Sequence, residues 1–151
     1  MTKVFSGEFT NISIKDLMIP ADKVAHVQMG NNLEHALLVL TKTGYTAVPV
    51  LDAQYRLHGL ITTNLIMDSI LGLERIEFER LQNMKVEEVM NRDVSRLNVS
   101  DDWMKALKLV INHTFVCITN EDGVLEGIFT RRVILKKLHK QLMILNSRFP
   151  K

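Results

Sequence analysis

The segments that decide the fold read GLITTNL at residues 59–65 and GIFTRRV at residues 127–133. Both follow an apolar run, and both have Gly and Thr at the same spacing. Further upstream, KDLM at 15–18 corresponds to EEVM at 87–90, and the pair Ala36 and Leu37 corresponds to Ala106 and Leu107. The same order of parts therefore occurs twice. A tandem repeat of this kind predicts two supersecondary units that pack on each other, because one unit cannot bury its apolar face alone.

The first repeat contains recognisable start and stop signals for helices and strands. Ser13 is positioned to cap a short helix that ends before Pro20, and an extended segment is expected over 24–27. Asn31 or Asn32 caps the next helix, whose apolar residues follow the i, i+3, i+4, i+7 spacing until Gly44 ends it. Paired strands at 47–51 and 57–61 and a helix over 63–71 complete a β-α-β-β-α unit.

The second repeat predicts the same elements in the same order. Ser100 is expected to cap its first helix, with Asp101 and Asp102 in the first turn. Strands at 115–119 and 125–129 follow, joined by a turn at 120–123, and then a helix from 131 to 142. Between the repeats, residues 73–83 have the pattern of a charged amphipathic helix.

Length and composition are those of a soluble globular domain. The chain has 151 residues, of which 46% are apolar and 24% charged, so we expect the two repeats to share one core. No apolar run approaches the ~20 residues that span a bilayer. The first eight residues have no apolar segment of signal-peptide length, which predicts a cytoplasmic protein. The single Cys117 lies in an apolar strand and is expected to be a buried, inert thiol.

The charge is uneven along the chain. The net charge is +2, but residues 127–151 carry seven Lys or Arg and no acid, whereas the rest has twelve bases and seventeen acids. A basic end of this kind attracts anions. Lys136, Lys137 and Lys140 lie outside the apolar stripe of their helix, so we interpret them as a solvated face. Arg131 and Arg132 differ because they stand at a strand-to-helix junction.

Two β-α-β-β-α units, each with Gly-x-x-Thr before the last helix, resemble a pair of CBS domains, the arrangement called a Bateman module. The resemblance implies an α/β fold with repeat 1 at 12–72, a connecting segment at 73–83, repeat 2 at 84–140 and a basic tail at 141–151. It implies that the repeats pack with pseudo-two-fold symmetry. The stretches 26–65 and 127–135 are also similar to the small stand-alone CBS proteins of Gram-positive bacteria that bind cyclic di-AMP, known as the CbpB or DarB type.

In CBS modules the ligand lies in a cleft between the repeats. Carried onto this sequence, the resemblance assigns ligand binding to Lys23, Val24, Ala25, Tyr45, Thr46, Ala47, Pro49, Thr130, Arg131 and Arg132. The chemistry agrees with this assignment. A helix N-terminus offers free N–H groups and a positive dipole end to a phosphate, and arginines donate forked hydrogen bonds to phosphate oxygens. A weaker second site is implied at Thr62, Thr63, Asn64, Arg92, Val94 and Phe115, where the helix start is polar but uncharged.

One departure from the family pattern concerns the ligand. Many nucleotide-binding CBS sequences continue Gly-x-x-Thr-x-x-Asp, and the Asp accepts hydrogen bonds from a ribose cis-diol. Here that position holds Leu65 in one repeat and Val133 in the other. Cyclic di-AMP has esterified 3′-hydroxyls and no cis-diol, so it loses nothing when the acid is absent. The departure favours a cyclic dinucleotide, while AMP or ATP bound through other contacts stays open.

The resemblance implies a regulatory ligand and no cofactor, metal or catalysis. The five histidines lack metal-ligand spacing, and no Ser-His-Asp order is evident. It also implies a homodimer and, as partners, a Rel-type (p)ppGpp synthetase/hydrolase of the stringent response and pyruvate carboxylase. Two other classes remain as alternatives, namely an interaction scaffold with vestigial clefts and a nucleic-acid binder that uses the basic tail. Nucleic acid is disfavoured because Phe149 is the only aromatic residue there.

Overall fold

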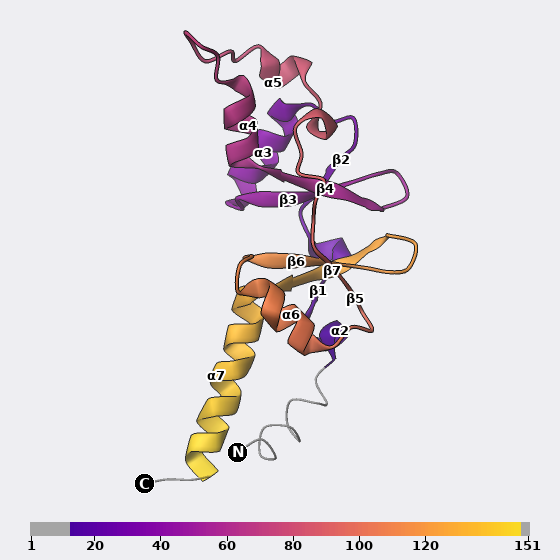
Figure 1. Ribbon diagram of the computed structural model, residues 1–151, viewed down its shortest axis with the longest axis vertical. Coiled ribbons are helices and arrows are strands. Elements are labelled where there is room, and N and C mark those ends of the chain that lie inside the picture. The colour runs from indigo at the N-terminus through magenta and orange to yellow at the C-terminus, as the bar shows by residue number, and fades with distance from the viewer. Residues whose placement is uncertain (1–12, 149–151) are drawn as a thin grey trace. The chain divides into compact units, whose positions relative to one another are not determined.

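The computed structural model describes residues 13–148 (Figure 1). Each repeat has the predicted order of one strand, a helix, two strands and a helix. The elements along the chain are α2 (Ile14–Leu17), β1 (Ile19–Pro20), the 3-10 helix η1 (Ala21–Lys23), β2 (Val27–Gln28), α3 (Leu33–Thr43), β3 (Ala47–Leu51), β4 (Leu57–Thr62), α4 (Thr63–Ile70), α5 (Arg80–Asn83), the 3-10 helix η2 (Val86–Glu88), β5 (Arg96–Asn98), α6 (Trp103–Val110), β6 (Phe115–Thr119), β7 (Leu125–Thr130) and α7 (Arg131–Arg148).

The chain forms two compact units whose boundaries do not follow the sequence repeats. The first-repeat unit contains residues 24–94 and the hairpin tip 121–125. The second-repeat unit contains, among the described residues, 13–23, 95–120 and 126–148. Each unit therefore holds the body of one repeat together with the first residues of the other repeat. We call these first residues the leading segments, 13–23 for repeat 1 and 84–94 for repeat 2. Residue 12, where the first repeat was expected to begin, lies outside the described residues.

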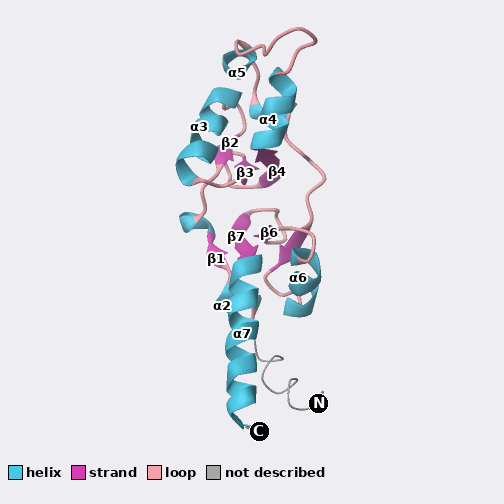
Figure 2. Cartoon of the chain, turned by 90° about the vertical axis from the view of Figure 1, so that its left-hand side faces the viewer, coloured by secondary structure: helices cyan, strands magenta, loops and turns pink. Residues whose placement is uncertain are grey.

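Each unit is built on a small mixed sheet. In the first-repeat unit the strand order is β2-β3-β4, with β2 parallel and β4 antiparallel to β3. In the second-repeat unit the order is β1-β7-β6-β5, and β5 is parallel to β6. The helices α3 and α4 lie on one face of the first sheet, and α6 and α7 lie on one face of the second (Figures 1 and 2). One face of each sheet is thus covered by helices from its own repeat.

The leading segment of each repeat lies along the last strand of the other repeat. In the second-repeat unit, Ile19 pairs with Ile128 and Pro20 with Gly127. In the first-repeat unit, Asn91 and Leu60 exchange two backbone hydrogen bonds of 2.8 and 2.9 Å. These pairings occupy equivalent positions, because Leu60 and Ile128 each directly follow the glycine of the repeated motif. The segments are exchanged symmetrically.

The motif glycines are required by this exchange. A Cβ on Gly59 would lie 2.6 Å from the carbonyl oxygen of Asn91, and a Cβ on Gly127 would lie closer still to that of Ile19. Met90 and Met18 approach the same two glycines with their sulfur atoms. Glycine is therefore present because two backbones meet there, and both glycines have ordinary extended dihedral angles rather than a positive φ.

Each unit has its own hydrophobic core, so the expectation of one shared core is wrong. In the first-repeat unit the core joins Leu33, Ile61 and Ile66 to Val86 and Met90 of the leading segment of repeat 2. In the second-repeat unit, Ile14 of the leading segment of repeat 1 packs with the following residues of repeat 2: Leu97, Trp103, Ala106, Val110, Val116, Ile118, Phe129 and Ile134. The exchanged segment supplies the apolar surface that a single repeat lacks, which allows two small cores to close separately.

Most helix boundaries agree with the sequence signals, and one capping residue differs. Ser13 accepts a hydrogen bond from the Lys15 N–H, Asn32 caps α3, and Gly44 ends α3 with φ +76°. In the second repeat the cap is Asp102 rather than Ser100, because the Asp102 carboxylate accepts the Met104 N–H at 3.1 Å. Ser100 lies two residues earlier, where its N–H and hydroxyl both donate to Asn98 Oδ1.

Three other boundaries also differ from expectation. The first strand covers Val27–Gln28, since residues 24–26 follow the 3-10 turn as irregular chain. In the connecting segment only Arg80–Asn83 is α-helical, because a tight turn, closed by the Gly72 N–H donating to the Arg75 carbonyl oxygen, occupies its first half. The last helix continues to Arg148, so 141–148 is helix and not tail. Residues 149–151 of the expected tail lie outside the described residues.

The close approach at the motif glycines leads to a stability prediction. Gly59→Ala and Gly127→Ala should each lower the free energy of unfolding by about 1–3 kcal/mol, because the new methyl group forces apart a backbone pairing. Thermal or urea denaturation measures this loss. Glu121→Ala, a change at an exposed turn residue, is the control and should leave stability unchanged. Wild-type stability of both glycine variants would show that the exchanged segments do not pack as described.

Cys117 provides a second test of the core. It is 1% exposed, and burial raises the pKa of its thiol to about 12. The reactive thiolate is therefore scarcely populated at about pH 8. We expect a disulfide reagent to label the native chain only as fast as it unfolds, and to label one thiol per chain at once in denaturant. Rapid labelling of the native protein would contradict the buried position.

Candidate functional site

The repeated Thr caps the last helix of each repeat. Thr130 Oγ1 accepts a hydrogen bond from the Val133 N–H at 3.1 Å, and Thr62 Oγ1 accepts one from the Leu65 N–H at 3.0 Å. Each hydroxyl satisfies one of the N–H groups that a helix start leaves without a partner. A hydroxyl has one donor as well, so Thr130 retains an O–H for a ligand.

The backbone at these helix starts is tied to the entry of the neighbouring strand. The Arg131 N–H donates to the Thr114 carbonyl oxygen at 2.8 Å, and the Thr63 N–H donates to the Thr46 carbonyl oxygen at 3.1 Å. The sequence assigned Thr46 to the main site together with Thr130–Arg132, and Thr63 to the weaker site together with Phe115. Each assignment combines the strand entry of one repeat with the helix start of the other, and it stays a prediction. Within the first-repeat unit the structure brings Thr46 and Thr63 together, and within the second-repeat unit it brings Thr114 and Arg131 together.

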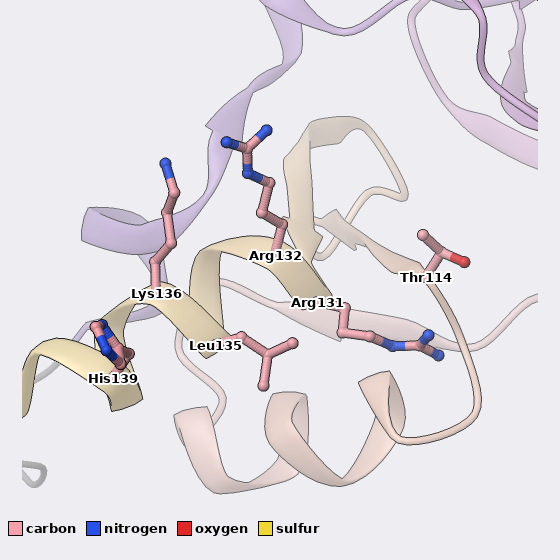
Figure 3. A pocket seen from close by; sticks show the side chains of 6 residues that line it. All are labelled: Thr114, Arg131, Arg132, Leu135, Lys136 and His139. Atoms are coloured by element: carbon pink, nitrogen blue, oxygen red, sulfur yellow. The ribbon is translucent and has the colours of Figure 1, made fainter. Parts of the chain in front are cut away.

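The two arginines predicted to hold phosphate point in different directions. Arg131 extends toward the end of α6 (Figure 3), where its Nε donates to the Val110 carbonyl oxygen at 2.9 Å and its Nη2 to that of Ile111 at 3.4 Å. Arg132 is exposed and extends from the other side of α7 (Figure 3). The guanidinium of Arg131 is therefore already engaged by the protein, whereas no side-chain partner of Arg132 occurs among residues 13–148.

An open pocket of about 460 Å³ lies over the first turns of α7. Three of its residues follow Arg132 along the helix, namely Leu135, Lys136 and His139, and Thr114 and Arg131 complete the lining. Arg132 and Lys136 extend in the same direction, one helical turn apart (Figure 3). The pocket thus presents cationic side chains beside an apolar one, a combination that suits a ligand with both phosphate and a flat base.

The equivalent surface of the first repeat is not cationic. Counting from the motif glycines, Arg132 corresponds to Asn64, Lys136 to Asp68 and His139 to Leu71. Thr63, in the place of Arg131, is too short to reach the end of α3, and Gly44 ends that helix instead. The sequence predicted a charge difference between the two helix starts at Thr130–Arg132. The structure extends this difference by one helical turn, to Lys136 and Asp68.

The remaining predicted residues fall in both units. Lys23 ends η1 in the second-repeat unit and is exposed. The other predicted residues of the main site, Val24, Ala25, Tyr45, Thr46, Ala47 and Pro49, belong to the first-repeat unit. Tyr45 and Thr46 are exposed just before β3, Ala47 begins that strand, and Pro49 is buried within it. The assignment of these residues to one cleft stays a prediction.

The residues of the expected weaker site are also distributed over both units. Thr62 and Thr63 are half-buried, and Asn64 is exposed at the start of α4. The Arg92 guanidinium donates to the Glu87 carbonyl oxygen at 3.0 Å, so this side chain already has a hydrogen-bond partner five residues away along the chain. Val94 and Phe115 are half-buried, the latter at the start of β6.

The residue three positions after each motif Thr is apolar in both repeats. Leu65 packs against the core of the first-repeat unit, and Val133 is half-buried in the first turn of α7. Among the described residues, no group of three or more His, Cys, Asp or Glu side chains is arranged to hold a metal ion. Within the same residues, no helix is long and apolar enough to cross a membrane.

Sequence reasoning missed four of the pocket residues, namely Thr114, Leu135, Lys136 and His139. The available signal was the spacing of Arg132, Lys136 and His139, which places the three on one helical face at i, i+4 and i+7. That face was interpreted as solvated because its lysine lies outside the apolar stripe. Lys136 is indeed exposed, but it also lines the pocket.

Comparison with known proteins agrees with this architecture. The sequence pattern of the family described as "CBS domain" matches residues 14–72 and 86–140. The chain belongs to the CBS-domain family. The resemblance inferred from the two Gly-x-x-Thr motifs is thereby confirmed, and so is the α/β fold with two CBS repeats.

Individual CBS proteins are similar over nearly the whole chain. The Cyclic di-AMP receptor B of Bacillus subtilis (strain 168) is 61% identical over 147 residues, which cover 97% of this chain and 100% of the relative. The crystal structure of Listeria monocytogenes CbpB in complex with c-di-AMP is 52% identical with a TM-score of 0.82, covering 87% of this chain and 98% of that one. A CBS domain-containing protein of Bacillus anthracis is 62% identical with a TM-score of 0.83, covering 89% and 98%.

The capping role of Thr130 can be measured directly. Thr130→Val removes the hydroxyl that accepts the Val133 N–H, and should lower the free energy of unfolding by about 0.5–2 kcal/mol. Thr130→Ser keeps the hydroxyl and should retain most of the stability. Denaturation of both variants separates the outcomes. Equal stability of the Val and Ser variants would show that the cap contributes nothing.

Proposed function

We propose that this CBS protein is a non-catalytic receptor for cyclic di-AMP that regulates partner proteins according to whether the ligand is bound. The main support is the cationic pocket at the start of α7. In addition, Leu65 and Val133 stand where many nucleotide-binding CBS sequences are expected to have an Asp. Cations favour the two phosphates, and the apolar residues remove only a contact that a ribose cis-diol needs. The 61% identical relative named Cyclic di-AMP receptor B supports the same ligand.

The proposed site combines the helix start Thr130–Arg132 with the residues that sequence analysis assigned to the main site. Lys23 adds a positive charge, and Ala25 and Ala47 are small enough to leave space for a base. The exposed ring of Tyr45, which is 56% accessible, is available to stack on that base. Charge-assisted hydrogen bonds to phosphate each contribute roughly 1.5–3 kcal/mol.

AMP or ATP sensing is the second candidate within the same ligand class. Both nucleotides supply phosphate for the cationic pocket, which is the observation that keeps them in consideration. Both also carry a free ribose cis-diol, and a hydroxyl buried without an acceptor costs about 1–3 kcal/mol. We therefore expect AMP and ATP to bind more weakly than cyclic di-AMP.

The regulatory part of the proposal rests on the family resemblance and on the exposed apolar side chains. Met104, Ile111, Leu135 and Leu142 are more than half exposed on α6, α7 and the residue after α6, which suits a homodimer formed through helices. We propose a Rel-type (p)ppGpp synthetase/hydrolase and pyruvate carboxylase as partners of the ligand-free form, in the cytoplasm. Ligand and partner must prefer different states or compete for one surface.

Titration calorimetry tests the ligand. Cyclic di-AMP should bind at least about tenfold more tightly than AMP or ATP, given the unpaired hydroxyls of the latter. Arg132→Met should weaken cyclic di-AMP far more than Asn64→Ala, its counterpart in the first repeat. No binding of any of the three nucleotides would favour a scaffold with vestigial clefts. Chromatography of cyclic di-AMP after incubation should recover it intact, and hydrolysis would refute the non-catalytic assignment.

A further inference from the structure

The side chain of Arg131 caps the C-terminal end of α6. The last carbonyl groups of a helix lack intrahelical partners. In the first repeat the Gly44 N–H donates to the Leu40 carbonyl oxygen at 3.0 Å, and the Thr43 hydroxyl donates to that of Val39 at 2.8 Å. Counted back from the motif glycine, the second repeat has Asn112 in the place of Gly44, and no residue at the end of α6 has a positive φ. The Arg131 guanidinium instead donates hydrogen bonds to the carbonyl oxygens of Val110 and Ile111.

Electrostatics favours this placement of Arg131. A cation is unfavourable at the N-terminus of its own helix α7 and favourable at the C-terminus of α6. The side chain extends away from the former and reaches the latter (Figure 3). Together with the Arg131 N–H bond to the Thr114 carbonyl oxygen, it holds the chain between α6 and β6 against the start of α7.

Lys136 has the opposite properties. It is exposed, lines the pocket and extends in the same direction as Arg132 (Figure 3). Residues at i and i+4 of a helix are neighbours at about 5–6 Å between their Cβ atoms. No acid pairs with either cation among residues 13–148, so both charges are available to an anion.

We propose that Arg132 and Lys136 are the cations that bind the phosphates of the ligand, and that Arg131 is a positioning residue that caps α6 and holds the pocket wall at Thr114. This inference rests on the proposed function and deepens it. The sequence predicted that Arg131 and Arg132 together bind phosphate, whereas the proposal assigns this role to Arg132 and Lys136, which lie one helical turn apart. In repeat 1 the equivalent residues are Asn64 and Asp68. The Asp68 carboxylate repels phosphate, so the proposal also accounts for phosphate binding at repeat 2 rather than at repeat 1.

The experiment compares Arg131→Gln, Arg132→Gln and Lys136→Gln, with Lys140→Gln as the matched control. Lys140 is an exposed lysine one turn further along α7 and does not line the pocket. Cyclic di-AMP affinity is measured at about 10 mM and about 0.15 M salt, between which the screening length falls from roughly 30 to about 8 Å. The melting temperature of each ligand-free variant is measured in parallel.

Arg132→Gln and Lys136→Gln should each weaken binding about tenfold at low salt, reduce the salt dependence of affinity and leave the melting temperature unchanged. Arg131→Gln should lower the melting temperature by several degrees while keeping the wild-type salt dependence. Arg131→Lys, which restores a cationic donor, should recover part of the melting temperature. Lys140→Gln should resemble the wild type in both measurements.

Two results would overturn the inference while the proposed function stands. One is wild-type affinity of the Lys136 variant. The other is an Arg131→Gln protein with wild-type melting temperature and the reduced salt dependence of Arg132→Gln. If Arg131→Gln does not fold, the Arg132, Lys136 and Arg131→Lys variants still decide the question. Failure of the unaltered chain to bind cyclic di-AMP would instead refute the proposed function, and the inference with it.

Discussion

Two backbones meet at Gly127, where the strand that precedes α7 pairs with the leading segment of the other repeat. The same meeting occurs at Gly59, between β4 and Asn91. Each contact brings an apolar side chain, Ile14 in one unit and Val86 in the other, into a core that a single repeat could not close. The helix starts that carry Thr130 and Thr62 directly follow these paired strands. Their placement therefore depends on the absence of a Cβ at two positions.

The repeat provides two equivalent helix starts, and a difference in charge distinguishes them. Both repeats keep the capping Thr and the backbone bond from the helix start to the strand entry. Only the second repeat has lysine or arginine at the pocket positions of the following turns, namely Arg132 and Lys136. The shared parts hold the fold, whereas Arg132 and Lys136 are exposed side chains that cost little to change. A symmetric scaffold can thus present one anion-binding surface.

The two repeats also end their first helices by different means. Gly44 adopts a left-handed conformation that only glycine adopts without cost. Arg131 does the same task from 21 residues away along the chain. The second solution connects the end of α6 to the helix start beneath the pocket, and the glycine in the first repeat makes no such connection.

Local signals in the sequence determined the repeats, the order of strands and helices, the caps at Ser13 and at Asn31 or Asn32, and the apolar residues Leu65 and Val133 after the two motif threonines. These features depend on hydrogen bonds and periodicity within a few residues, so they can be predicted without knowing the fold. The tertiary structure decided that two cores form by exchange of leading segments, that Arg131 faces the end of α6, and that Thr114 lines the pocket beside the start of α7. These depend on which distant carbonyl groups and side chains packing brings within reach, and the spacing of residues along the chain does not contain that information.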